Sequence, residues 1–288
     1  MWHTLSVQLS LALGQQFEVE EKMPIDGGDI NECYSIGCGD TRFFVKINAK
    51  ENLPIYEAEA EGLRHLANSG EVSVPQVIYI GVIKEKAVLV LDFIVMKPLN
   101  DENGYLLGKD LARLHKWGEQ PEYGFDIDNF IGTTEQRNNW HRKWAQFFAD
   151  HRIGLQLKLA EEKGMFFGDI ETIVEAVKER LSNHQPKASL LHGDLWSGNA
   201  SSTMNGPILY DPACYWGDRE VDVAATHLFG GFPESFYRGY NEVWPLDEGF
   251  ESRKDLYNLY HLINHSLLFG GHYLAQTEAL INKLELLN

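Results

Sequence analysis

Cysteines, long apolar runs and basic residues are all scarce in this sequence of 288 residues. The three cysteines, Cys33, Cys38 and Cys214, form no CxxC pair and no zinc-finger spacing with histidine, so we expect free thiols in a reducing compartment, the cytoplasm. No apolar stretch reaches the roughly 18 residues of a membrane-spanning helix, so no membrane association is expected. Lys and Arg number 25 against 42 Asp and Glu, and the formal net charge of −17 argues against a nucleic-acid partner.

The composition is that of a globular protein, with 44% hydrophobic and 12% aromatic residues. Alternation around Gly-rich turns in the first third predicts strands at 17–23, 33–36, 42–47, 74–80 and 87–95, with a helix at 55–67. Helical spacing dominates beyond Asn100, at 104–117, 139–163 and 170–181 and again from Val221. We therefore predict an α+β fold with a β-rich nucleotide-binding lobe at 1–96, a helical catalytic and substrate lobe at 97–288, and a ligand cleft between them.

The loop His192-Gly-Asp-Leu-Trp-Ser-Gly-Asn199 carries the strongest chemical signal, since it has the H-x-D-x-x-x-x-N spacing of a kinase catalytic loop. In that chemistry Asp194 takes the proton of an acceptor hydroxyl, Asn199 ligates Mg²⁺ through its amide oxygen, and His192 braces the loop. Asp211 follows at the end of an apolar strand, where a carboxylate can bind the Mg²⁺ of ATP. The alternative is an ordinary polar turn, because Gly, Asp, Ser and Asn all favour turns. The complete set in this order favours the kinase.

Lys46 lies in the middle of the otherwise apolar strand 43–47. A lysine inside a sheet needs a partner, and in a kinase this lysine contacts the ATP phosphates and pairs with a helix glutamate. Glu59 is the favoured partner, but helical spacing alone does not choose between it and Glu57 or Glu61. The alternative is an edge-strand lysine that faces water.

Weaker signals surround these residues. Gly28 lies in a Gly-Gly turn that suits either a phosphate-covering loop or a plain hairpin, since no G-x-G-x-x-G is present. Trp196 and Trp216 could stack on a sugar or fill space, and with Asp218 they are candidate substrate contacts. Asp218 and Asp222 also suit a helix cap or loop support, and this structural role is favoured for both. Four histidines without ligand spacing are expected to be structural or exposed: His115, His141, His261 and His265.

The catalytic loop and the segment Tyr210-Asp-Pro-Ala-Cys-Tyr-Trp-Gly-Asp-Arg-Glu220 together resemble the fructosamine kinase (ketosamine-3-kinase) family, particularly its bacterial members, within the protein-kinase-like superfamily. Further similar segments are 44–48, 57–59, 74–75, 111–115 and 229–232. The resemblance implies a two-lobed protein-kinase-like fold that uses ATP and Mg²⁺. It gives Asp194 the role of catalytic base and Asn199 and Asp211 that of metal ligands. Lys46 would contact the phosphates of ATP, with Glu59 as its partner. The implied hinge that meets adenine consists of Leu91, Asp92, Phe93 and Ile94.

The implied reaction transfers the γ-phosphate of ATP to the 3-hydroxyl of a ketosamine. The acceptor would be ribulosamine, erythrulosamine or fructosamine, free or on a protein lysine, and the role protein deglycation. Two alternatives remain: a small-alcohol kinase of the aminoglycoside or choline type, and a nucleotide-binding pseudokinase scaffold. Asp211-Pro-Ala in place of Asp-Phe-Gly argues against a protein kinase with an activation loop. Asp29 stands where some relatives carry a bridging cysteine, so we expect a monomer without a disulfide-linked dimer.

Overall fold

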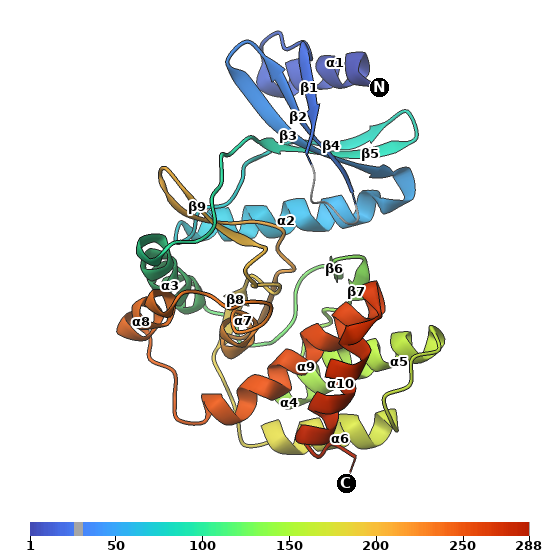
Figure 1. Ribbon diagram of the computed structural model, residues 1–288, viewed down its shortest axis with the longest axis vertical. Coiled ribbons are helices and arrows are strands. Elements are labelled where there is room, and N and C mark those ends of the chain that lie inside the picture. Colours follow the sequence, from blue (N-terminus) through green and yellow to red (C-terminus); the bar gives the residue numbers. More distant parts are fainter. Residues whose placement is uncertain (26–30, 288) are drawn as a thin grey trace.

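A five-stranded antiparallel sheet with a helix on each face forms the N-terminal part of the molecule (Figure 1). The computed structural model describes residues 1–25 and 31–287. The N-terminal elements are α1 (Trp2–Leu13), β1 (Glu21–Pro24), β2 (Glu32–Cys38), β3 (Thr41–Ala49), α2 (Leu53–Ser69), β4 (Val77–Ile83) and β5 (Lys86–Asp92). The strands lie in the order β1-β2-β3-β5-β4.

Two apolar clusters cover the two faces of this sheet, because successive side chains of a strand point to opposite sides. Val45 of β3 packs in one cluster with Leu5 of α1. Leu89 of β5 packs in the other cluster with Tyr56 of α2. Lys46 follows Val45 directly, so the same alternation turns its side chain toward α2 and away from α1.

Helices dominate the C-terminal part, and short antiparallel ladders interrupt them (Figure 1). The helices are α3 (Asp101–Lys116), α4 (Trp144–Phe147), α5 (Leu155–Glu162), α6 (Ile170–Leu181), α7 (Glu220–Ala225), α8 (Glu234–Val243), α9 (Phe250–Phe269) and α10 (His272–Lys283). The strands are β6 (Asn129–Ile131), β7 (Thr134–Gln136), β8 (Ala188–Leu191), β9 (Ala200–Thr203), β10 (Gly206–Leu209) and β11 (Tyr215–Asp218). One apolar core joins these helices, with the rings of Trp144, Phe147 and Tyr257 among its buried side chains.

The β8–β11 ladder brings the two polar segments of the catalytic motifs side by side. Leu191 at the end of β8 pairs with Tyr215 at the start of β11. The loop 192–199 and the segment 210–214 therefore meet at one end of this ladder, where the Ala213 amide donates to the His192 carbonyl at 2.8 Å. Helix α2 packs on the second segment at Gly62, where a Cβ would lie 3.1 Å from the Pro212 side chain. Helix α2 therefore lies between the N-terminal sheet and the segment 210–214 and holds them close together.

The predicted α+β fold, with an antiparallel N-terminal sheet and a mostly helical C-terminal part, is confirmed. The architecture changes between Asp92, which ends β5, and Asp101, which begins α3. A lobe boundary at residue 96 stays a prediction. Among the described residues, no helix has the length and apolarity needed to cross a bilayer.

Two predicted elements differ from the structure. The strand expected at 17–23 is limited to β1, because the amide of Phe17 donates to the Ser10 hydroxyl of α1 instead of to a neighbouring strand. The helix expected at 139–163 begins at Trp144, since His141 is held in a backbone bridge with Tyr123. Its middle part, Phe148–Gly154, is a π-helix.

Candidate active site

Lys46 is held between two carboxylates at the junction of the two parts of the molecule. Its Nζ lies 2.8 and 3.0 Å from the two carboxylate oxygens of Glu59 and 2.5 Å from Oδ1 of Asp211. Burial alone would lower the pKa of Lys46, but the charges of Asp211 and Glu59 raise it well above its usual value. The lysine therefore stays charged inside the molecule.

The partner of Lys46 on α2 follows from the register of that helix. Glu59 comes three residues after the buried Tyr56, so it lies on the helix face that packs on the sheet. Glu57 is exposed, and Glu61 pairs with Arg64 and His65 instead. The favoured pair of Lys46 with Glu59 is present, and an edge-strand lysine facing water is excluded because Lys46 is only 6% exposed.

The loop after β8 is fixed from behind by Asp222 of α7. The carboxylate of Asp222 accepts hydrogen bonds from the amides of His192, at 2.7 Å, and Gly193, at 2.8 Å. His192 in turn spans the two polar segments, because its Nε2 donates to the carbonyl of Tyr210 at 3.0 Å. Gly193 has φ +84, and a Cβ there would lie 2.0 Å from the Ala213 carbonyl oxygen, so the tight passage requires glycine.

Asp194 is the most chemically unusual carboxylate of the loop. Its Oδ2 accepts a hydrogen bond from Nδ2 of Asn199 at 3.1 Å, whereas its Oδ1 is buried and accepts none from the described residues. Burial first, and the nearby charge of Asp211 second, raise the pKa of Asp194 to about 7. A carboxyl group with such a pKa is suited to take a proton from a hydroxyl near neutral pH.

Asn199 and Asp211 supply oxygen atoms of the kind that Mg²⁺ prefers. The Nδ2 of Asn199 donates to the backbone carbonyl and to the carboxylate of Asp194, so its Oδ1 is the end of the amide available to a cation. Asp211 has φ +53, an unusual backbone conformation for a residue other than glycine, and its side chain is 46% exposed. The residue types and their placement fit a Mg²⁺ ion held by Asn199 and Asp211.

A cavity of about 230 Å³ connects these groups. Its walls come from the N-terminal sheet and α2, from the β6–β7 ladder, from both polar segments and from the end of α9. Its lining includes Lys46, Tyr56, Glu59, Asn129, Phe130, Asp194, Trp196, Asn199, Asp211, Asn264, His265, Leu268 and Phe269. The structure thus brings together six residues singled out from the sequence: Lys46, Glu59, Asp194, Trp196, Asn199 and Asp211.

Trp216 and Asp218, expected as candidate substrate contacts, do not line this cavity. The ring of Trp216 stacks on Trp117, with the ring centroids 6.0 Å apart. Asp218 is 1% exposed, and its Oδ1 accepts from the amide of Glu220 at 3.1 Å. Both side chains make contacts within the C-terminal part, and for Asp218 this is the favoured structural role. A substrate contact of Trp216 or Asp218 stays a prediction.

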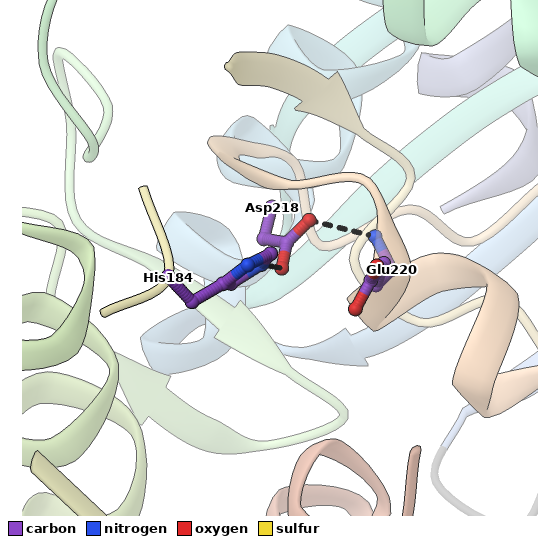
Figure 2. Close-up of side chains that lie close together, drawn as sticks. All are labelled: His184, Asp218 and Glu220. Atoms are coloured by element: carbon purple, nitrogen blue, oxygen red, sulfur yellow. Dashed lines mark hydrogen bonds and ion pairs between the residues drawn. The ribbon is translucent and has the colours of Figure 1, made fainter. Parts of the chain in front are cut away.

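Asp218 belongs to a group of three potential metal ligands with His184 and Glu220 (Figure 2), whose ligand atoms lie within 4.8 Å of one another. Oδ2 of Asp218 already accepts hydrogen bonds from His184 at 2.7 Å and from the Tyr257 hydroxyl at 2.5 Å. Both carboxylate oxygens of Glu220 accept from Arg253, at 2.7 and 2.8 Å. With its oxygens occupied by N–H and O–H donors, this group is a buried ion-pair network and not a metal site.

The remaining predicted nucleotide contacts that the structure describes do not line the cavity. Leu91 and Asp92 end β5, and Phe93 and Ile94 begin the chain that leaves the sheet. The Gln76 amide donates to the Asp92 carboxylate at 2.6 Å, which fixes this chain where it turns away. A contact of this segment with adenine stays a prediction. Gly28 lies outside the described residues.

Sequence reasoning missed the contribution of α9. His265 and Asn264 line the cavity, and His261, one turn earlier, lies behind Asp194. Their spacing of four residues within an apolar, Tyr-rich helix is the available signal, because it places His261 and His265 on one face. The structure shows both histidines buried, as one of the two expectations for them allowed.

Comparison with known proteins agrees with this geometry. The model of the fructosamine kinase family matches residues 1–287. A "Probable ketoamine kinase" of Vibrio cholerae serotype O1 is 54% identical over 285 residues, which are 99% of each chain. The chain belongs to the fructosamine kinase family. As a member of this family it is an ATP-dependent phosphotransferase that acts on a hydroxyl group.

Solved structures extend the comparison to the fold. A crystal structure named "Putative fructosamine-3-kinase" from Haemophilus somnus 129PT has a TM-score of 0.95 and 37% identity, covering 99% of this chain and 97% of that chain. An aminoglycoside phosphotransferase in a ternary complex with ADP and hygromycin B has a TM-score of 0.67 at 15% identity, covering 98% and 97%. The fold of this fructosamine kinase family member is therefore kinase-like, as expected.

Proposed function

We propose that the enzyme phosphorylates the 3-hydroxyl of ketosamines and so acts in protein deglycation. The acceptors would be ribulosamine, erythrulosamine or fructosamine, free or on protein lysines. The observation that carries this proposal is Asp194, a carboxyl group with a raised pKa that lines a cavity together with Asn199 and Asp211. The family model and the ketoamine kinase relative support a sugar-amine as the acceptor.

In this reaction Asp194 accepts the proton of the acceptor hydroxyl as that oxygen attacks the γ-phosphate. Its pKa near 7 makes it a stronger base than an ordinary surface carboxylate. Lys46, oriented by Glu59, contacts the phosphates of ATP. Asn199 and Asp211 hold Mg²⁺, which neutralises phosphate charge when it is bound. The ADP named in the complex of the kinase-like neighbour supports the use of a nucleotide.

The acceptor would enter between α2 and the end of α9. The cavity of about 230 Å³ would take the phosphate groups at Lys46 and Asp211 and the acceptor hydroxyl at Asp194. Trp196 remains a proposed substrate contact, since it lines the cavity next to Asp194 and its ring packs edge-on against His265. An acceptor attached to a protein lysine is compatible with this arrangement.

One chain supplies the lysine, the proposed base and both proposed metal ligands, so we propose that a monomer is sufficient for the reaction. A cytoplasmic location fits the same proposal, because ATP and glycated cytosolic proteins are found together there.

A phosphate-transfer screen tests the proposal. Purified protein is incubated with Mg²⁺ and γ-³²P-labelled ATP and with ribulose-lysine, fructose-lysine, choline or an aminoglycoside, and Asp194→Asn serves as the matched inactive control. We expect label only on the ketosamines, with NMR placing it on the 3-hydroxyl. Preferential transfer to choline or the aminoglycoside would replace the proposal with a small-alcohol kinase. Nucleotide binding without transfer to any of the four would support the scaffold alternative.

A further inference from the structure

The two oxygens of the Asp194 carboxylate have different surroundings. Oδ2 accepts from Asn199 at 3.1 Å, while Oδ1 is buried without a hydrogen bond from the described residues. The indole of Trp196 also interacts with this carboxylate, but Trp196 lines the cavity and lies on the acceptor side. A carboxylate that must accept a proton in one direction needs its plane fixed, so a second group behind Oδ1 would matter for the reaction.

His261 is the side chain that lies behind Oδ1. Its Nδ1 is 3.7 Å from Oδ1 of Asp194, and its ring is 2% exposed within α9. Its Nε2 is also buried and has no hydrogen-bond partner among the described residues. His261 does not line the cavity, so an acceptor would not compete for it.

The protonation of His261 follows from these contacts. Burial first, and the neighbouring His265 second, lower the pKa of His261 to about 3, so the ring is neutral and carries a single N–H. With the proton on Nε2, that N–H would be buried without an acceptor and the Nδ1 lone pair would face a carboxylate. With the proton on Nδ1, the N–H faces Oδ1 of Asp194. The second tautomer avoids both unfavourable contacts.

We propose that His261 is a positioning residue for phosphate transfer: its Nδ1–H holds Oδ1 of Asp194 while Asn199 holds Oδ2, so the carboxylate faces the acceptor hydroxyl. The distance of 3.7 Å is longer than a hydrogen bond. Such contacts in free enzymes often tighten when substrates bind. This inference rests on the proposed role of Asp194 as the base.

Three substitutions separate positioning from packing. In His261→Asn the amide Nδ2 takes the place of Nδ1 and keeps a donor toward Asp194. His261→Gln places its amide near the former Nε2, and His261→Leu keeps an apolar side chain without a donor. We expect kcat to fall about 30-fold in the Leu and Gln variants and to stay within about 3-fold of the wild type in the Asn variant. The KM values for ATP and for the ketosamine should change less than about 2-fold in all three, because neither substrate touches His261.

A spectroscopic measurement on the wild-type enzyme covers the case in which a variant fails to fold. Long-range ¹H–¹⁵N NMR of histidine-labelled protein should show His261 as the Nδ1–H tautomer, with its signals shifted in Asp194→Asn. The proposal is overturned by the Nε2–H tautomer, by equal losses of kcat in the Asn and Leu variants, or by a change confined to KM. If the wild type phosphorylates no ketosamine, the proposed function fails separately, while the tautomer and the rate of MgATP hydrolysis still test His261.

Discussion

Asp194 and Asp222 are two carboxylates of the same site region with opposite electrostatic behaviour. Asp222 is fully buried and accepts hydrogen bonds from the His192 amide, the Gly193 amide and Nε2 of His115, the last at 3.1 Å. Burial alone would raise the pKa of Asp222, but these donors, His115 foremost, lower it. Asp194 has its pKa raised to about 7 by burial and by Asp211.

The difference shows that the number of hydrogen-bond donors, more than burial, decides whether a buried carboxylate stays ionised. Three donors keep Asp222 ionised, and its negative charge fixes the backbone of the loop. Asp194 has Asn199 at Oδ2 and the Trp196 indole beside it, but its Oδ1 accepts no hydrogen bond from the described residues, so burial and Asp211 keep its proton affinity high. One carboxylate supports the loop that carries the other.

The largest effect should come from Asp194→Asn. We expect kcat for the ketosamine to fall at least about 1,000-fold, because the amide cannot accept the hydroxyl proton. The free energy of unfolding should stay the same or rise, since a neutral amide replaces a buried carboxylate that lacks donors. Steady-state kinetics and urea unfolding measure the two quantities.

The affinity for a non-hydrolysable ATP analogue serves as the control for this variant. It should change less than about 3-fold in isothermal titration calorimetry, because Lys46 and Asp211 are untouched. A loss of stability as large as that of an Asp222 variant would contradict the division between a reactive and a supporting carboxylate.

For Asp222, the carboxylate that supports the loop, substitution should lower stability first and activity only as a consequence. Asp222→Asn removes a buried charge that accepts three hydrogen bonds, and we expect the free energy of unfolding to fall by about 3 kcal/mol, with activity falling as a consequence. Urea unfolding at pH 7 measures it. The matched control Asp126→Asn changes an exposed carboxylate and should shift stability by less than about 0.5 kcal/mol. Comparable unfolding free energies for Asp222→Asn and Asp126→Asn would contradict the structural role of Asp222.

The sequence was sufficient to predict that Asp194, Asn199 and Asp211 lie in one site, but not what surrounds them. Asp194, Asn199 and Asp211 lie within one motif pair, and the spacing in the chain reflects their chemistry directly. The kinase pattern also predicted that Lys46 pairs with a glutamate of α2, which the structure contains as Glu59. Donors from distant elements were not predictable, because His115 is 107 residues from Asp222 in the chain and reaches it only through the packing of α3. The partners of Asp218 were not predictable for the same reason, since Tyr257 and His184 meet it only in the folded chain.

The smallest effect concerns the histidines beside the two carboxylates. Burial lowers the pKa of His115, and the pKa of His261 is about 3. Below the unfolded-state pKa of about 6.5, these histidines bind protons in the unfolded chain but not in the folded chain, so their contribution to stability falls as the pH falls. For His261 alone this amounts to about 2 kcal/mol between pH 7 and pH 5. The raised pKa of Asp194 acts in the opposite direction over the same interval, because the folded chain takes up that proton. Asp222 contributes nothing in this window, because its lowered pKa places its own loss of stability at more acidic pH.

Urea unfolding at pH 7 and pH 5 measures this effect in the wild type and in His261→Leu. The wild type should lose about 2 kcal/mol more than the variant over this interval, because leucine has no proton to bind in either state. His115 and His192 contribute with the same sign in both proteins, and Asp194 contributes with the opposite sign in both, so these contributions cancel in the difference. Equal losses would mean that His261 is protonated in the folded enzyme. The ring would then form an ion pair with Asp194, and the contrast between a carboxylate rich in donors and one poor in them would no longer hold.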